Sequence, residues 1–238
     1  MRLIVGMTGA TGAILGIRLL QELAGQPDVE THLVTSRWAR ATIELETGWS
    51  ARQVADLADV VHGPDDQAAS ISSGSFRTDG MVILPCSAKT LAAIRAGYGS
   101  DLVSRAADVI LKERRPLVLG VRETPLSTIH LENMLALSRM GVTILPPMPA
   151  FYNKPATVDD IVDHLVARVM DQLGLDSERA VRWQGPATAR RGDRRTPPDS
   201  DVPTPIALGR PRDGVTTTAR TAHGTSTGSR PAGVSPLM

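Results

Sequence analysis

Glycine and threonine residues follow the first apolar run of the chain and could bind a phosphate. Residues 3–5 are Leu-Ile-Val, residues 6–13 read GMTGATGA, and a helical pattern begins near Ile14. A strand that turns into a helix leaves backbone N–H groups without partners at the positive end of the helix dipole. Glycines allow close approach to the backbone, and Thr8 and Thr11 add hydroxyls. The turn therefore predicts a phosphate-bearing ligand.

This turn alone leaves the identity of the ligand open. Its G-x-x-G-x-x-G spacing is similar to that of extended short-chain dehydrogenases, which keeps NAD(P) as an alternative. However, the next predicted strand ends at Ser36-Arg37, without the acidic residue that holds a ribose. Neither Tyr98 nor Tyr152 is followed four residues later by the lysine that this enzyme family needs. A tight turn without a ligand is the other alternative.

Further polar side chains stand where other predicted strands end. Residues 85–90 (PCSAKT) open a helix with hydroxyls at Ser87 and Thr90, which predicts a second anion-binding helix start or a simple cap. The hydroxyl-rich segment 70–76 (SISSGSF) is a candidate ligand-covering loop. Arg122 and Glu123 follow a strand, where adjacent opposite charges suit a buried polar site.

Cations and a tyrosine in the second half of the chain suggest a second phosphate site. The run at 112–115 (KERR) is typical of a solvated helix end, although Lys112 could point inward. Three prolines within 146–152 hold Tyr152 in a rigid extended segment. Arg168 lies in the last predicted helix, where a surface arginine is the simpler interpretation. A tyrosine hydroxyl and a guanidinium together nevertheless suit a phosphate monoester.

The sequence carries no motif for a metal site or a serine nucleophile. No G-x-S-x-G elbow is present. The five histidines lack metal-ligand spacing, so we expect each to have a core or surface role: His32, His62, His130, His164 and His223.

Alternating strand and helix patterns position these residues. The strands are expected at 2–6, 31–35, 81–85, 117–121 and 142–145, and the helices at 13–23, 37–47, 89–95, 102–113, 128–139 and 158–173. Thr157 and Asp160 form a predicted capping box, and Gly174 is a predicted C-terminal cap. This order predicts a single-domain, three-layer α/β/α fold with a doubly wound, mostly parallel sheet. Ligands of such sheets bind at the carboxyl ends of strands, near the switch point.

Composition places the ordered domain at residues 1–184 and a disordered tail at 185–238. The tail carries eight arginines and four aspartates, hence +4, which leaves −3 on the rest of a chain whose formal net charge is +1. It holds eight of the seventeen prolines and none of the seven aromatic residues. We expect a core of Leu, Val, Ile and Ala. The single cysteine, Cys86, the near-neutral charge and the lack of a long apolar run predict a cytoplasmic protein that binds neither nucleic acid nor membrane.

Together these motifs resemble the UbiX-like flavin prenyltransferases, from Arg2 to about Trp183. The resemblance is carried, in order, by TGATGA at 8–13, ELET at 44–47, SSGS at 72–75, PCS at 85–87, RAADV at 105–109, KERRPLV at 112–118, RETP at 122–125, HLENM at 130–134 and PAFY at 149–152. It implies a flavodoxin-like or Rossmann-like subunit of a homododecamer, with FMN bound between subunits. Such enzymes transfer a dimethylallyl group from dimethylallyl phosphate to N5 and C6 of reduced FMN without a metal. Their product, prenylated FMN, serves a UbiD-like decarboxylase, and older descriptions called the family aromatic acid decarboxylases.

The resemblance also implies roles for individual residues. Glu46, Glu123, Lys112 and Thr11 would be catalytic, with the two glutamates managing protons. Many relatives have Ser where this chain has Thr11, so the added methyl group could alter the rotamer of its hydroxyl. The flavin would be held by Gly9, Ala10, Thr11, Ser36, Ser87, Ala88, Lys89, Thr90 and Arg122, and the prenyl phosphate by Lys112, Tyr152 and Arg168, with Trp183 closing the pocket. An FMN-dependent cysteine decarboxylase and a non-catalytic flavin carrier are the alternatives.

Overall fold

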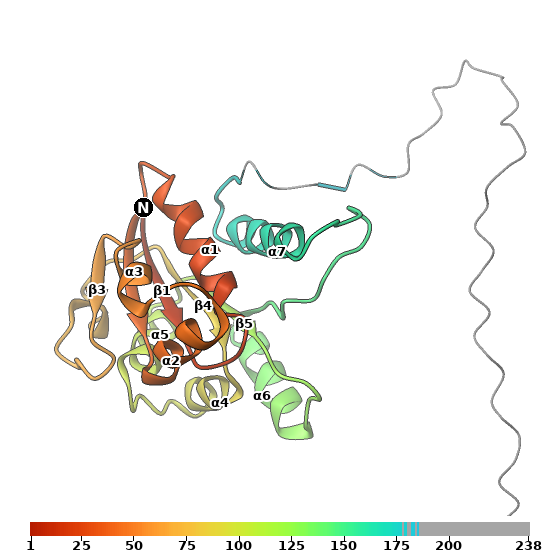
Figure 1. Cartoon of the computed structure of the whole chain (residues 1–238). Coiled ribbons are helices and arrows are strands. Elements are labelled where there is room, and N and C mark those ends of the chain that lie inside the picture. The colour runs from red at the N-terminus through yellow and green to blue at the C-terminus, as the bar shows by residue number, and fades with distance from the viewer. Residues whose placement is uncertain (178, 180–181, 184, 186–238) are drawn as a thin grey trace, which may run out of the picture. The chain divides into compact units, whose positions relative to one another are not determined.

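A six-stranded parallel sheet forms the centre of the protein, in the order β3-β2-β1-β4-β5-β6 (Figure 1). The computed structural model describes residues 1–177, 179, 182, 183 and 185, so the predicted tail lies outside the described residues except for Gly185. The strands are β1 (Arg2–Met7), β2 (Glu30–Thr35), β3 (Val60–His62), β4 (Gly80–Cys86), β5 (Leu117–Val121) and β6 (Thr143–Ile144). This is the strand order of a doubly wound Rossmann-like sheet, which confirms the predicted fold class.

Helices cover both faces of this sheet, as the alternating pattern predicts. They are α1 (Ala13–Ala24), α2 (Arg37–Glu46), α3 (Ala51–Ala55), α4 (Ala88–Ala96), α5 (Leu102–Lys112), α6 (Thr128–Arg139) and α7 (Val158–Gln172), with a short 3-10 helix, η1 (Ser70–Ser72). Residues of α1, α2, α3 and α7 pack in one core cluster, and those of α4, α5 and α6 pack in the other. The predicted capping box of Thr157 and Asp160 begins α7.

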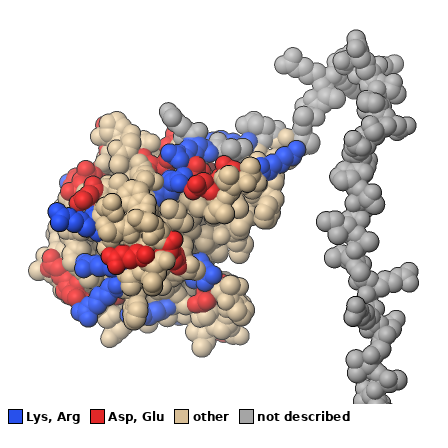
Figure 2. Space-filling view, viewed as in Figure 1, with Lys and Arg blue, Asp and Glu red and all other residues tan. Residues whose placement is uncertain are grey.

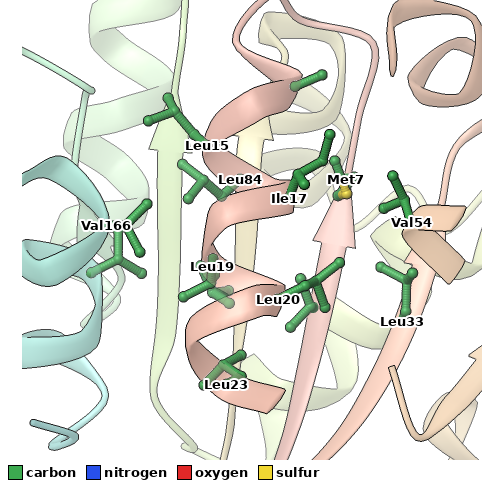
Figure 3. Close-up of a cluster of buried hydrophobic side chains, with 14 of the residues drawn as sticks. Met7, Leu15, Ile17, Leu19, Leu20, Leu23, Leu33, Val54, Leu84 and Val166 are labelled. Carbon is green, nitrogen blue, oxygen red and sulfur yellow. The ribbon is translucent and has the colours of Figure 1, made fainter. Parts of the chain in front are cut away.

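Alternating strand residues supply the two cores. Leu3, Val5 and Met7 of β1 face the α1 side, whereas Ile4 faces the α5 side. Figure 3 shows α1 beside α7 on one face of the sheet, with Leu19 on the side of Val166 and Leu20 on the side of Leu33. Among the described residues the fully buried apolar side chains include no aromatic ring, as predicted.

The segments after β1 and β4 diverge to opposite faces of the sheet. The chain passes from β1 to α1 on one face and from β4 to α4 on the other. The carboxyl ends of these two adjacent strands are therefore the switch point of the sheet. Thr8 joins them, because its buried hydroxyl donates to the Pro85 carbonyl at 2.8 Å and accepts the Ser87 N–H at 2.8 Å.

Two short elements, β3 and α3, were not predicted. β3 has three residues at the edge of the sheet with Val61 about half exposed, and α3 has five residues with only Val54 buried. Neither is long enough to show a clear hydrophobic period. Acidic and basic side chains are interspersed on the face shown in Figure 2. No helix within the described residues has the length and apolar character needed to cross a membrane.

Candidate active site

A pocket of about 550 Å³ opens at the switch point and brings together much of the predicted flavin site. Its lining includes Gly9, Ser36, Ser87, Lys89 and Thr90. The hydroxyls of Ser36 and Ser87 cap α2 and α4, accepting the N–H of Ala39 at 3.1 Å and of Thr90 at 3.3 Å. The beginnings of α2 and α4 thus both contribute hydroxyl-bearing residues to the lining of one hollow.

The beginning of α4 is the part of this pocket that best fits a phosphate. Ser87 Oγ lies 3.1 Å from Thr90 Oγ1, and the exposed Lys89 adds a cation. The first N–H groups of a helix have no partners within the helix, so those of Ala88 and Lys89 are oriented for an anion. This donor set fits the phosphate of a flavin mononucleotide.

The beginning of α1, by contrast, is already bound by a carboxylate. Glu46 at the end of α2 accepts the N–H of Gly12 at 2.8 Å and of Ala13 at 3.1 Å. Two of the donors expected to hold a phosphate are therefore used inside the chain. Partial burial opposes ionisation of Glu46. The hydrogen bonds from Thr11, Gly12 and Ala13 and the charge of Arg122 nevertheless lower its pKa below the ordinary value.

Gly9 of the first turn lines the same pocket. A side chain at Gly9 would collide with the Cβ of Trp38, so this glycine allows the turn to lie against α2. Ala10 follows it and is half-buried.

Arg122 and Glu123 stand where β5 ends. The Arg122 N–H donates to the Cys86 carbonyl at 3.0 Å, which ties this turn to the end of β4. One oxygen of Glu123 accepts the Thr124 N–H at 3.1 Å, and the side chain is half-buried. Cys86 itself is buried in the core, and this burial raises the pKa of its thiol to about 12.

A second pocket, of about 260 Å³, gathers the predicted prenyl phosphate residues of α7 and its surroundings. Tyr152, Arg168 and Trp183 line it together with His164 and Asp171. The rings of Tyr152 and Trp183 meet edge to face at 5.5 Å. Arg168 pairs with Asp171, and Asp171 also forms an ion pair with Arg182 at 2.9 Å. The proximity of Tyr152, Arg168 and Trp183 was predicted, whereas the contacts of His164 and Arg182 were not.

Lys112 lies in a third group, at the end of α5. Its ammonium is 2.5 Å from a Glu113 oxygen, and nearly half of its side chain is exposed. The 72–75 loop packs against this pair, because a side chain at Gly74 would collide with both of its charged groups.

Arg105 on α5 was missed by the sequence analysis. Its Nε donates to the Ser72 carbonyl at 3.2 Å, so it contacts the same loop as Lys112. Arg105 and Lys112 are seven residues apart and therefore share one face of α5, and that spacing could have identified Arg105 as a candidate.

One chain does not bring these three groups into a single site. α5 and α7 pack in core clusters on opposite faces of the sheet, so Lys112 and Arg168 are separated by it. A further hollow of about 790 Å³ lies at the amino ends of the strands and is lined by residues such as Arg2 and Asp59. Its lining includes no predicted site residue. The described residues contain no cluster of three or more potential metal-ligating His, Cys, Asp or Glu side chains.

Comparison with known proteins identifies the family. The family model described as Flavoprotein matches residues 1–170. A probable UbiX-like flavin prenyltransferase from Escherichia coli O157:H7 is 72% identical over 190 residues, covering 80% of this chain and 96% of that protein.

Two solved structures are similar over most of their lengths. A dodecameric FMN-dependent UbiX-like decarboxylase from Escherichia coli O157:H7 has a TM-score of 0.77 and 72% identity, covering 78% of this chain and 100% of that one. AnUbiX, in complex with FMN and dimethylallyl pyrophosphate, has a TM-score of 0.75 and 55% identity, covering 77% of this chain and 97% of that one. This chain therefore belongs to the UbiX-like flavin prenyltransferase family.

Proposed function

We propose that this protein transfers a dimethylallyl group from dimethylallyl phosphate to reduced FMN, which yields prenylated FMN. The observation that carries this proposal is the presence of two anion-binding groups with different chemistry. One is the hydroxyl-rich pocket at the switch point, and the other is the Tyr152 and Arg168 pocket beside α7. Two phosphate-bearing molecules, a flavin nucleotide and an allylic ester, match these two groups.

FMN binds at the switch point. Its phosphate lies at the beginning of α4, held by Ser87, Ala88, Lys89 and Thr90. Gly9, Ala10, Thr11, Ser36 and Arg122 contact the rest of the nucleotide. Reduced FMN, when bound, supplies the nucleophilic N5 and C6 atoms.

Two cations and a tyrosine hydroxyl stabilise the leaving phosphate. Lys112, Tyr152 and Arg168 bind its oxygens, so the negative charge that develops as the C–O bond breaks is offset where it forms. The allyl fragment leaves as a delocalised cation, and Trp183 beside Tyr152 shelters it through cation–π attraction and exclusion of water.

The two glutamates serve the proton steps. Glu46 carries a carboxylate that can accept a proton, although the hydrogen bonds that lower its pKa also weaken it as a base. Its contacts with the α1 start also hold the flavin turn in place. Glu123, at the end of β5, is the second proton acceptor.

A complete site requires neighbouring copies of the chain. α5 and α7 cover opposite faces, so Lys112 of one copy meets Arg168 of another in a homododecamer like that of the E. coli relative. Exposed apolar side chains support such assembly, including Trp38, Leu45, Ile129 and Leu131. A UbiD-like decarboxylase in the cytoplasm receives the product, and the single buried cysteine fits that reducing compartment.

Incubation with reduced FMN and dimethylallyl phosphate tests the function. We expect the mass of the recovered flavin to increase by one prenyl unit, with release of inorganic phosphate. An unchanged flavin would favour a carrier, which binds FMN without chemistry. A cysteine decarboxylase would also leave the flavin without an added prenyl unit.

A further inference from the structure

His164 of α7 is buried behind the Tyr152 hydroxyl. Its side chain lines the same pocket as Arg168, one helical turn further along, and the residue is only 6% exposed. Its Nε2 lies 3.3 Å from Tyr152 Oη, and the two rings meet edge to face at 5.5 Å. Its Nδ1 is buried and has no hydrogen-bond partner among the described residues.

The unpartnered Nδ1 selects the direction of the hydrogen bond. A buried N–H without an acceptor is rarer and more costly than a buried lone pair, so Nδ1 carries no hydrogen. The ring then has a hydrogen on Nε2 and donates it to the oxygen of Tyr152. Because that oxygen already accepts one bond, the Tyr152 hydroxyl hydrogen is free to donate to a ligand.

We propose that His164 is a positioning residue that orients the Tyr152 hydroxyl as a donor to the phosphate of the prenyl substrate. The opposite arrangement would be unfavourable, because a hydroxyl that donates to His164 presents only lone pairs to an anion. This inference rests on the proposed function, since it assigns the phosphate of dimethylallyl phosphate to the Tyr152 pocket.

Two substitutions of His164 distinguish the effect of its hydrogen-bond donor from the effect of its size. His164→Leu keeps an apolar side chain without the donor, whereas His164→Gln places an amide N–H near the position of Nε2. Calorimetric titration of dimethylallyl phosphate into protein loaded with oxidised FMN measures binding without turnover. We expect His164→Leu to weaken binding roughly five- to tenfold and His164→Gln to retain most of the affinity, with FMN affinity unchanged in both. During turnover the KM for dimethylallyl phosphate rises more than kcat falls.

A double substitution tests whether His164 acts through Tyr152. In a Tyr152→Phe background, His164→Leu should cause no further loss of affinity, because the hydroxyl that it orients is absent. If His164→Leu does not fold, His164→Asn replaces it, since its shorter amide does not reach Tyr152.

Unchanged affinity in the Leu variant, equal loss in the Gln variant, or additive losses in the double variant would each overturn the inference. Failure of the proposed function is distinguishable, because it appears in the unsubstituted protein as a flavin of unchanged mass.

Discussion

At the scale of single residues, Arg168 is the cation placed best to distinguish the two ligands. It lies beside Tyr152 in the α7 pocket, whereas the flavin candidates line a different pocket. We expect Arg168→Ala to raise the KM for dimethylallyl phosphate roughly 10- to 100-fold, as loss of a charge-assisted hydrogen bond does. FMN retention should stay near that of the unsubstituted protein.

Steady-state kinetics and flavin absorbance measure these two effects. Arg52→Ala on α3, an exposed arginine outside both pockets, is the matched control. Equal loss of FMN and prenyl phosphate binding in Arg168→Ala would contradict the assignment.

His62 makes stability depend on pH. Burial and the neighbouring His32, whose Nδ1 lies 3.0 Å from His62 Nε2, lower the pKa of His62 below 6.5, and Asp66 opposes the shift only partly. The unfolded chain therefore binds this proton more readily, so the contribution is present above about pH 6.5 and is lost as pH falls through the lowered pKa. We expect the thermal midpoint to fall between pH 7.5 and 5.5, and to fall less in His62→Gln. An identical slope for both proteins would exclude His62 as the cause.

At the scale of elements, the contact between the first turn and α2 shapes the flavin pocket. A Cβ on Gly9 would overlap the Cβ of Trp38, which is fixed to the backbone of α2 and cannot swing away. We expect Gly9→Ala to destabilise the fold by about 1–3 kcal/mol and to weaken FMN binding. Urea unfolding and flavin titration measure the two effects.

Gly48→Ala is the matched control for this prediction. Gly48 has no atoms within 4 Å of an added Cβ and does not have a positive φ. A Gly9→Ala variant as stable as Gly48→Ala, with full FMN affinity, would show that the two elements can separate without cost.

At the scale of the whole molecule, the separation of α5 from α7 predicts shared sites. Lys112→Ala and Arg168→Ala should each be poorly active alone. When the two variants are coexpressed, a site that takes these residues from different copies contains both native side chains in about a quarter of cases. We therefore expect about a quarter of the unsubstituted activity in purified mixed oligomers.

The outcome distinguishes between two arrangements of the site. Mixed oligomers no more active than the separate variants would place both residues in the same copy. The separately purified variants, mixed without coexpression, control for activity that does not depend on joint assembly.

Much of the fold follows from local patterns in the sequence. The predicted strand at 117–121 and helix at 128–139 have the observed bounds, because buried apolar runs and capping residues delimit them. Ser36, Ser87 and Thr90 line one pocket because the carboxyl ends of parallel strands lie side by side, whereas their common role was predicted from the family resemblance. β3 and α3 escaped prediction because their few buried residues show no period.

Sequence alone established a doubly wound α/β fold, a polar site at its switch point and a family resemblance, since each depends on local order along the chain. Tertiary structure decided which partners those groups have. Glu46 binds the start of α1 from 33 and 34 residues away, and His164 meets Tyr152 from a helix whose local pattern suggested only a core or surface position. The sheet that separates Lys112 from Arg168 is likewise a property of packing. Contacts of this kind depend on how elements pack in three dimensions, which no local spacing encodes.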